Sequence, residues 1–232
     1  MPEASAVAII PARGGSKRLP RKNVLPFNGR PIIEYTVEAA LGSGCFERVV
    51  VSSDDEEILD VARKSGADVD RRTDELGSDT ATVSDVCRDL LLREAAEERT
   101  YLRLAALYAT SPMRTAEDIR NTMALLDHPD CNYAIATTRY SHYSHQSLAI
   151  LGDDFVEPRW PEIYFRSPRD IGPIACGNGS TYCADVKSFM ASGVFLGPGT
   201  RAYMMPMSRS IDIDTMEEFR LAEHLQGMAS KV

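Results

Sequence analysis

The sequence near the amino end reads VAIIPARGGSKRLPRKN over residues 7–23. Residues 7–12 are a short apolar run, as expected for a strand that is buried on both faces of a sheet. The loop that follows contains two glycines and five basic side chains. A buried strand that ends in such a loop indicates an open α/β sheet, in which ligands bind beyond the C-terminal ends of the strands.

Strand-like and helix-like segments alternate from here to residue 138. Strands are predicted at residues 48–52, 102–109 and 133–138, and helices at residues 31–42, 55–65, 83–98 and 116–126. Such alternation implies parallel strands joined by crossover helices. The pattern resumes at residues 180–184 and ends with a helix from Thr215. We therefore expect a Rossmann-like α/β fold, with an open, mostly parallel sheet and helices on both faces.

The stretch from residue 139 to residue 179 does not follow this pattern. It is rich in Pro, Tyr, His, Ser and Arg and has only short apolar runs. A structureless loop of this size is uncommon inside a compact domain. We expect residues 139–179 to form a small inserted lobe that contains β structure or packs on a partner. Residues 1–138 and 180–232 would then form the α/β domain.

Composition excludes several classes of protein. The chain has 232 residues and a formal charge of -8, which argues against a broad nucleic-acid-binding surface. Its five cysteines are scattered and form no C-x-x-C pair, as expected for a reduced cytoplasmic protein without structural zinc. Neither a signal-like start nor a long apolar segment is present in the sequence, so we expect no membrane association.

The loop at residues 12–23 is a candidate phosphate-binding site. Gly14 and Gly15 let backbone amides approach an anion closely, and the basic side chains supply charge suited to a triphosphate. The loop matches neither the dinucleotide-binding motif G-x-G-x-x-G nor the P-loop motif G-x-x-x-x-G-K-[ST]. A solvated basic loop on an acidic protein is the alternative interpretation.

Asp212 and Asp214 form a second candidate site. Side chains two residues apart on an extended segment point the same way, so both carboxylates can face one ligand. Two carboxylates together with substrate phosphates make a Mg²⁺ site. The alternative is that Asp214 belongs to the start of the last helix, where Thr215 and Glu218 fit a capping box.

Three motifs together resemble those of the acylneuraminate cytidylyltransferases, which include CMP-sialic acid synthetases and relatives that activate pseudaminic and legionaminic acids. The motifs are ARGGSKRLPRKN at residues 12–23, TSPMRT at residues 110–115 and IDIDT at residues 211–215. The resemblance covers nearly the whole chain. It implies a Mg²⁺-dependent enzyme that converts CTP and a nine-carbon sugar acid to a CMP-sugar and pyrophosphate. It also implies a homodimer, or a dimer of such dimers, in which each lobe reaches over the neighbouring subunit's site.

The resemblance also assigns roles to individual residues. The implied catalytic residues are Arg13, Lys17, Lys22 and Asp212. The implied nucleotide-binding residues are Ala12, Arg13, Gly14, Gly15, Ser16, Lys17, Asn23, Arg72 and Ala81, of which the last two match the segment that lines the cytosine pocket. The implied metal ligands are Asp212 and Asp214.

Departures from the family pattern concern the sugar. The typical sialic acid enzyme has QPTSP where this chain has YATSP at residues 108–112, and RPNG where this chain has CGNG at residues 176–179. The residues at 108–110, Gln146 and the Arg166-Ser167 pair are similar to the pseudaminic acid branch, whereas Asn178-Gly179 is not. The substrate-binding candidates are Tyr108, Gln146, Arg166, Arg169 and Asn178, and a guanidinium of Arg166 or Arg169 could grip the sugar carboxylate. Two alternatives stay open: another acid acceptor, such as Kdo or a phosphonate, and a catalytically inactive nucleotide-binding regulatory module.

Overall fold

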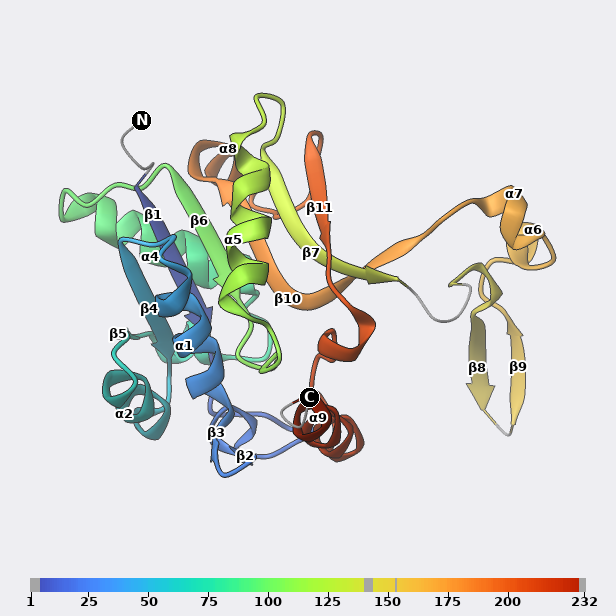
Figure 1. Cartoon of the computed structure of the whole chain (residues 1–232), viewed down its shortest axis with the longest axis horizontal. Helices are drawn as coiled ribbons and strands as arrows, with labels where there is room; N and C mark the ends of the chain where they lie inside the picture. The colour runs from blue at the N-terminus through green and yellow to red at the C-terminus, as the bar shows by residue number, and fades with distance from the viewer. Residues whose placement is uncertain (1–4, 140–143, 153, 230–232) are drawn as a thin grey trace.

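Figure 1 shows the computed structural model of the chain, which describes residues 5–139, 144–152 and 154–229. A seven-stranded sheet has the order β11-β7-β10-β6-β1-β4-β5. Its strands are β1 (Ala6–Pro11), β4 (Arg48–Ser53), β5 (Asp68–Arg71), β6 (Arg103–Leu107), β7 (Tyr133–Arg139), β10 (Ala175–Asp185) and β11 (Thr200–Met204). Within this sheet, β10 runs antiparallel to β6 and β7, and the other neighbours are parallel. The expected mostly parallel, Rossmann-like fold is confirmed.

Helices cover both faces of this sheet (Figure 1). On one face lie α1 (Ile32–Ser43), α2 (Glu56–Lys64) and α5 (Ala116–Ala124), and on the other lie α4 (Val83–Ala96) and α8 (Val186–Ser192). Alternate residues of β1 enter the two cores, because side chains of a strand alternate between its faces. Ile10 packs in the core that contains Ile119 of α5, whereas Ile9 packs in the core that contains Leu90 of α4.

A third, smaller core joins segments from the two ends of the chain. It contains parts of the loop after β1, the hairpin of β2 (Pro26–Phe27) and β3 (Arg30–Pro31), and α9 (Met216–Ala229). Phe27 is fully buried there and meets the ring of Phe219 edge-on, with centroids 5.5 Å apart. Leu19 and Ile213 belong to the same core. The basic loop and the segment of the two aspartates are therefore packed together.

Polar caps set the beginnings of several helices. Asp55 accepts a hydrogen bond from the backbone of Ile58 at the start of α2. Capping boxes begin α4 and α5, as expected for Thr followed three residues later by an acidic side chain. The sequence pattern did not predict the short elements β2, β3, β5 and α3 (Asp74–Gly77), which carry few periodic apolar residues.

The residues between β7 and β10 form a lobe that stands to one side of the sheet (Figure 1). Its elements are η3 (Ser144–Gln146), β8 (Leu148–Gly152), β9 (Phe155–Pro158), α6 (Pro161–Tyr164) and α7 (Pro168–Ile171). The ends of β7 and β10 pair as far as Arg139 and Ala175 and carry the lobe. Residues 140–143 and 153 of the expected lobe lie outside the described residues.

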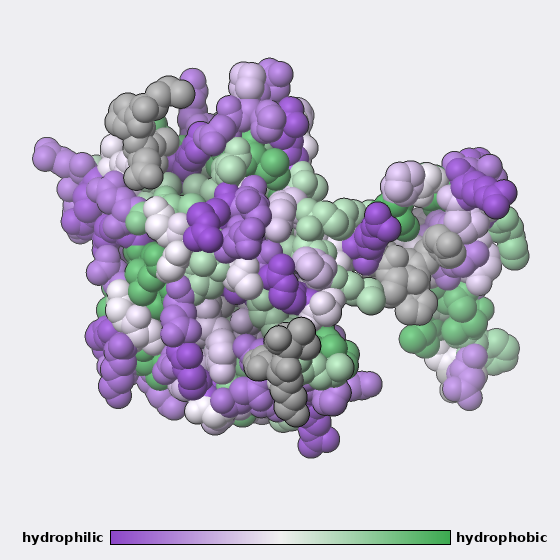
Figure 2. All heavy atoms as spheres, viewed as in Figure 1, coloured by the Kyte–Doolittle hydropathy of each residue, from purple (hydrophilic) through white to green (hydrophobic). Residues whose placement is uncertain are grey.

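Large apolar side chains are exposed on this lobe. Ile150 is 84% exposed, Phe155 70% and Phe165 86%. Figure 2 shows hydrophobic residues gathered on the lobe, beside polar ones. Exposed apolar clusters of this kind are typical of interaction surfaces. Separately, no helix among the described residues has the length and apolar character needed to cross a bilayer.

A buried arginine connects the strands below the pocket described next. Arg114 is only 3% exposed and donates hydrogen bonds to the Ser180 carbonyl (2.6 Å), the Thr36 hydroxyl (2.8 Å) and the Tyr108 carbonyl (3.3 Å). Burial lowers the pKa of Arg114 to about 10, so it is a cation at neutral pH. Its guanidinium thus ties α1, β10 and the end of β6 together.

We expect Arg114→Met to lower the free energy of unfolding by about 2–4 kcal/mol, because buried acceptors would lose their donor. Urea unfolding of the intact chain measures this change. Arg220→Met is the control, since Arg220 is exposed on α9 and its substitution should cost less than about 0.5 kcal/mol. Equal effects of the two substitutions would contradict the role given to Arg114.

Candidate active site

A pocket of about 400 Å³ opens beyond the C-terminal ends of β1 and β6. The chain passes from β1 to β4 and β5 on one side and then returns to β6 on the other side of β1. The strand order therefore reverses between β1 and β6. Open α/β sheets bind ligands in the crevice at such a switch point. The pocket walls come from the loop after β1, Arg72, the segment that leads into α4, the end of β6 and the two aspartates.

The loop after β1 is held in place by its own Asn23 and by two aspartates that follow β4. Asn23 is buried, and its amide donates to the Arg13 carbonyl at 2.8 Å. The amide N–H of Gly14 donates to Asp54 at 3.1 Å. A Cβ atom on Gly14 would lie 2.7 Å from the carboxylate of Asp55, so only glycine fits this close approach. These contacts fix the course of the loop.

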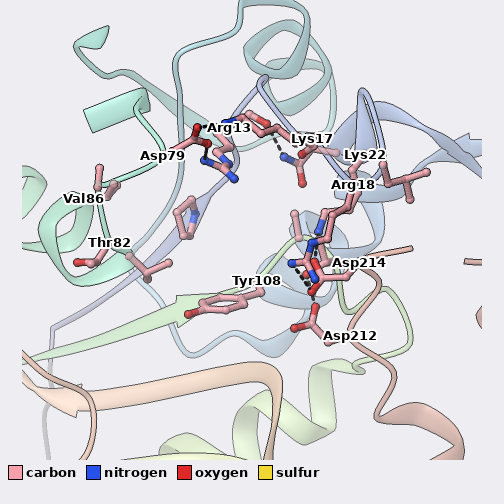
Figure 3. Close-up of a pocket in the computed structure, with 18 of the residues that line it drawn as sticks. Arg13, Lys17, Arg18, Lys22, Asp79, Thr82, Val86, Tyr108, Asp212 and Asp214 are labelled. Carbon is pink, nitrogen blue, oxygen red and sulfur yellow. Dashed lines mark hydrogen bonds and ion pairs between the residues drawn. The ribbon is translucent and has the colours of Figure 1, made fainter. Parts of the chain in front are cut away.

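The carboxylate of Asp214 meets two cations of this loop. The Lys22 ammonium donates to Asp214 at 2.8 Å, and Arg18 lies 2.6 Å from the other carboxylate oxygen. Partial burial works against ionisation of Asp214, but Lys22 and Arg18 outweigh it and lower its pKa. The basic loop and the aspartate pair therefore converge in one pocket (Figure 3).

Asp212 has a different environment from Asp214. It accepts a hydrogen bond from the Thr110 hydroxyl at 2.5 Å, and burial raises its pKa. The Ile213 amide donates to the Thr110 carbonyl at 3.0 Å, which fixes the segment against the end of β6. Ile213 is fully buried while both aspartates line the pocket, as the alternation of side chains predicts. Gly179 has φ +64°, and a Cβ there would collide with the Asp212 carboxylate.

The other two loop cations that line the pocket, Arg13 and Lys17, form ion pairs with Asp79. The sequence did not predict this contact. Arg13 donates to Asp79 at 2.7 Å, and Lys17 pairs with the second oxygen of the same carboxylate. These cations lower the pKa of Asp79, Lys17 more than Arg13. Arg21 instead pairs with Asp55 and with a neighbouring acid of α2. The five basic residues of the loop thus separate into four at the pocket and one behind it.

The wall opposite the aspartates contains Arg72 and the residues that lead into α4. The Arg72 side chain is only 5% exposed and lies 3.7 Å from Asp54. Burial lowers its pKa, and within the described part of the chain its Nε has no hydrogen-bond partner. Ala81 and Thr82 line the pocket beside it. The buried Arg72 side chain lines the pocket, and its guanidinium is suited to a polar edge of a ligand there.

Tyr108 borders the pocket at the end of β6, and Tyr182 packs against its ring. Tyr108 lies between Thr82 and Asp212 in Figure 3. Its ring is 5.3 Å from the ring of Tyr182, centroid to centroid, and burial raises the pKa of Tyr108 to about 12. Tyr108 is therefore neutral at pH 7. It was expected from the sequence, whereas Tyr182, on the antiparallel strand β10, was not.

Several expected residues do not line this pocket. Ala12 is buried, and its amide donates to the Ser52 carbonyl at 3.0 Å. Asn178 is also buried; its amide donates to the Ser210 hydroxyl at 3.0 Å, two residues before Asp212. This contact positions the aspartate segment, and direct contact between Asn178 and a sugar stays a prediction.

The remaining sugar-binding candidates lie on the lobe. Gln146, Arg166 and Arg169 are exposed there and do not line the pocket of their own chain. The structure therefore does not bring them together with Asp212 within one chain. Their role in binding the sugar stays a prediction.

Arg18, Thr110 and Asp79 are pocket residues that the sequence predictions omitted. Arg18 belongs to the expected loop, but counting charges does not show which side chains face the ligand. Thr110 lies in the middle motif, where the sequence gives no sign of its bond to Asp212. Asp79 lies 66 residues from its partner Arg13 in a segment without periodicity, so no local pattern could have identified the contact.

Comparisons with known proteins agree with this geometry. Residues 7–165 match the model of the family described as "Cytidylyltransferase". The chain is 31% identical over 221 residues to the pseudaminic acid cytidylyltransferase of Campylobacter jejuni subsp. jejuni, covering 94% of this chain and 95% of that protein. It is 32% identical over 242 residues to the CMP-N,N'-diacetyllegionaminic acid synthase of Legionella pneumophila subsp. pneumophila, covering 96% of each.

A solved structure shares the fold. The CMP:2-keto-3-deoxy-manno-octonic acid synthetase complexed with CTP superposes with a TM-score of 0.69 at 19% identity, over 99% of this chain and 100% of that one. At this identity the likeness concerns the fold alone. The family match spans more than half of the chain, and the two relatives match it almost from end to end. The chain therefore belongs to the cytidylyltransferase family.

Proposed function

We propose that this chain transfers CMP from CTP to a nonulosonic acid, a nine-carbon sugar acid, and releases pyrophosphate. The observation that carries the proposal is the meeting of the basic loop and the aspartate pair in one pocket at the switch point of the sheet. The two relatives named above are described as enzymes of pseudaminic and diacetyllegionaminic acid. Both acids belong to the proposed substrate class.

The loop cations would bind the triphosphate. Arg13, Lys17, Arg18 and Lys22 all line the pocket, and their partners there are carboxylates, which phosphate oxygens can replace. In the proposed reaction the anomeric hydroxyl of the sugar attacks the α-phosphorus, and the bond from this phosphorus to pyrophosphate breaks. Positioning and charge neutralisation are the main contributions that a protein makes to such transfers.

Asp212 and Asp214 would hold Mg²⁺. The described residues contain no group of three or more His, Cys, Asp or Glu side chains arranged around a metal, but Mg²⁺ commonly uses one or two carboxylates together with phosphates. Asp212 is largely buried and accepts its hydrogen bond from a neutral hydroxyl, so a cation would compensate its charge. Bound Mg²⁺ would neutralise charge on the leaving pyrophosphate.

Cytosine would lie against the wall formed by Arg72 and Ala81. The Arg72 guanidinium lines this wall, and the carbonyl edge of cytosine can accept a hydrogen bond from it. The apolar side chains of Val83 and Val86 complete the wall and fit the flat face of a base. This places the base on one side of the pocket and the aspartates on the other.

The sugar would bind beyond Tyr108, under the lobe of a second subunit. The exposed apolar side chains of the lobe need a partner, and Gln146, Arg166 and Arg169 need a pocket that their own chain does not give them. In a homodimer whose lobes each reach over the other subunit, the apolar side chains would be covered and these three residues would face the neighbouring pocket. Identities of 31% and 32% do not separate pseudaminic from legionaminic acid, so we propose the substrate class only.

Two other proposals are less well supported. A Kdo acceptor would rest on a structure that is 19% identical, which shows the fold alone. A catalytically inactive regulatory module would not require that both aspartates and four cations line one pocket.

The reaction is proposed for the cytoplasm, and the five free cysteines fit a reducing compartment.

Asp212→Asn and Asp214→Asn should each lower kcat at least about 100-fold, because each removes a proposed Mg²⁺ ligand. Pyrophosphate release from CTP and a panel of nonulosonic acids measures the effect. Asp130→Asn is the control, since Asp130 is exposed and does not line the pocket. Full activity of either pocket variant with Mg²⁺ would contradict the metal assignment.

Arg72→Met should raise the KM for CTP about tenfold or more, because a donor to the base would be lost. Binding of inorganic pyrophosphate should not change. Arg71→Met provides a matched control, since the adjacent Arg71 is exposed and pairs with Glu56. If Arg72→Met weakened pyrophosphate binding as much as CTP binding, the cytosine assignment would be wrong.

Mixed dimers test the proposed lobe exchange. An Asp212→Asn chain and a chain with both Arg166→Ala and Arg169→Ala should each be inactive alone. Mixed one to one and allowed to exchange subunits, they should regain about a quarter of wild-type activity, because half of the dimers are mixed and each has one intact site. Absence of recovery, with subunit exchange verified by mass spectrometry, would mean that each lobe does not serve its neighbour.

A further inference from the structure

Asp79 forms ion pairs with two cations, Arg13 and Lys17, at one end of the pocket. One of its carboxylate oxygens accepts from Arg13 at 2.7 Å, and the other pairs with Lys17. Among the described residues, these are the contacts that the carboxylate makes. The side chain is 50% exposed, so burial does not fix it in place. The contact is therefore a surface ion pair that another anion can displace.

The two oxygens of the Asp79 carboxylate contact Arg13 and Lys17 as two oxygens of a phosphate group would. A phosphate group binds to paired cations through two oxygens, as the Asp79 carboxylate does here. Asp214 also pairs with loop cations, but it is a proposed metal ligand and so has a function when CTP is bound. We assign no such second role to Asp79, and a triphosphate on Arg13 and Lys17 would meet its negative charge directly.

The segment that carries Asp79 lies between two fixed points. Before it, Gly77 packs so closely on Asp54 that a Cβ would lie 2.9 Å from the Asp54 Cβ. After it, Thr82 takes part in the capping box of α4. Asp79 and Thr80 between these points are exposed. The side chain can thus turn away without moving Ala81 or α4.

We propose that Asp79 sets the affinity of the pocket for polyphosphate, by holding Arg13 and Lys17 until CTP displaces it and by taking them back when pyrophosphate leaves. This inference rests on the proposed function, because it assumes that these two cations bind the triphosphate. Asp79 acts through them and is a positioning residue. Its effect applies to CTP and pyrophosphate alike, so it weakens uniform binding and favours product release.

The test is titration calorimetry on the intact protein with inorganic pyrophosphate, CTP and cytidine, without acceptor. Asp79→Asn should lower the Kd for pyrophosphate and for CTP by about 5- to 20-fold, since two cations lose a competing anion in a partly solvated site. Cytidine binding should stay the same, because cytidine has no phosphate. In turnover assays, the KM for CTP should fall and inhibition by pyrophosphate should strengthen, while kcat does not rise.

Asp74→Asn is the matched control, because it removes the same charge from the neighbouring α3. Asp74 is exposed there and, within the described part of the chain, is not paired with the loop cations. It should change the Kd for pyrophosphate by less than about twofold. An unchanged or higher Kd for pyrophosphate in Asp79→Asn would overturn the inference. If the wild-type chain bound neither CTP nor pyrophosphate, the proposed function itself would fail, which is a separate outcome.

Discussion

Ile213 packs in one core with Leu19 and Phe27, and this contact determines where the two charged segments of the chain lie. Hydrophobic burial has no direction of its own. Direction comes from the extended backbone, which turns Ile213 inward and therefore turns Asp212 and Asp214 toward the pocket. Residues almost two hundred positions apart, such as Lys22 and Asp214, thus meet at 2.8 Å. Without this small core, neither segment would make a site.

Carboxylates pair with all four loop cations that line the pocket. Asp79 and Asp214 each pair with two loop cations, and Asp54 accepts from the Gly14 amide. The pairs made by Arg13, Lys17 and Arg18 are largely exposed, and such pairs typically contribute about 0–1 kcal/mol, whereas the Lys22–Asp214 pair is partly buried. In the proposed function, phosphate oxygens would replace these carboxylates on the cations. A preformed and exchangeable site fits a reaction that must bind a triphosphate and then release pyrophosphate.

The sequence was informative where long periodic segments and helix caps determine the structure. Alternation of strands and helices predicted the parallel sheet, and the capping box of Thr215 and Glu218 is confirmed by their mutual hydrogen bonds. Contacts between distant segments were not predictable: Asp79 and Tyr182 lie in stretches whose spacing gives no sign of their partners. Nor can one chain's pattern place Gln146 and Arg166, because the expected neighbour of the lobe is another copy.

A crystal structure of the chain with CTP and Mn²⁺ tests the central claim most directly, because the anomalous signal of manganese locates the metal. The account predicts the triphosphate on Arg13, Lys17, Arg18 and Lys22, with manganese bound by Asp212 and Asp214. A nucleotide bound with its phosphates away from the loop, or manganese bound away from both aspartates, would contradict it.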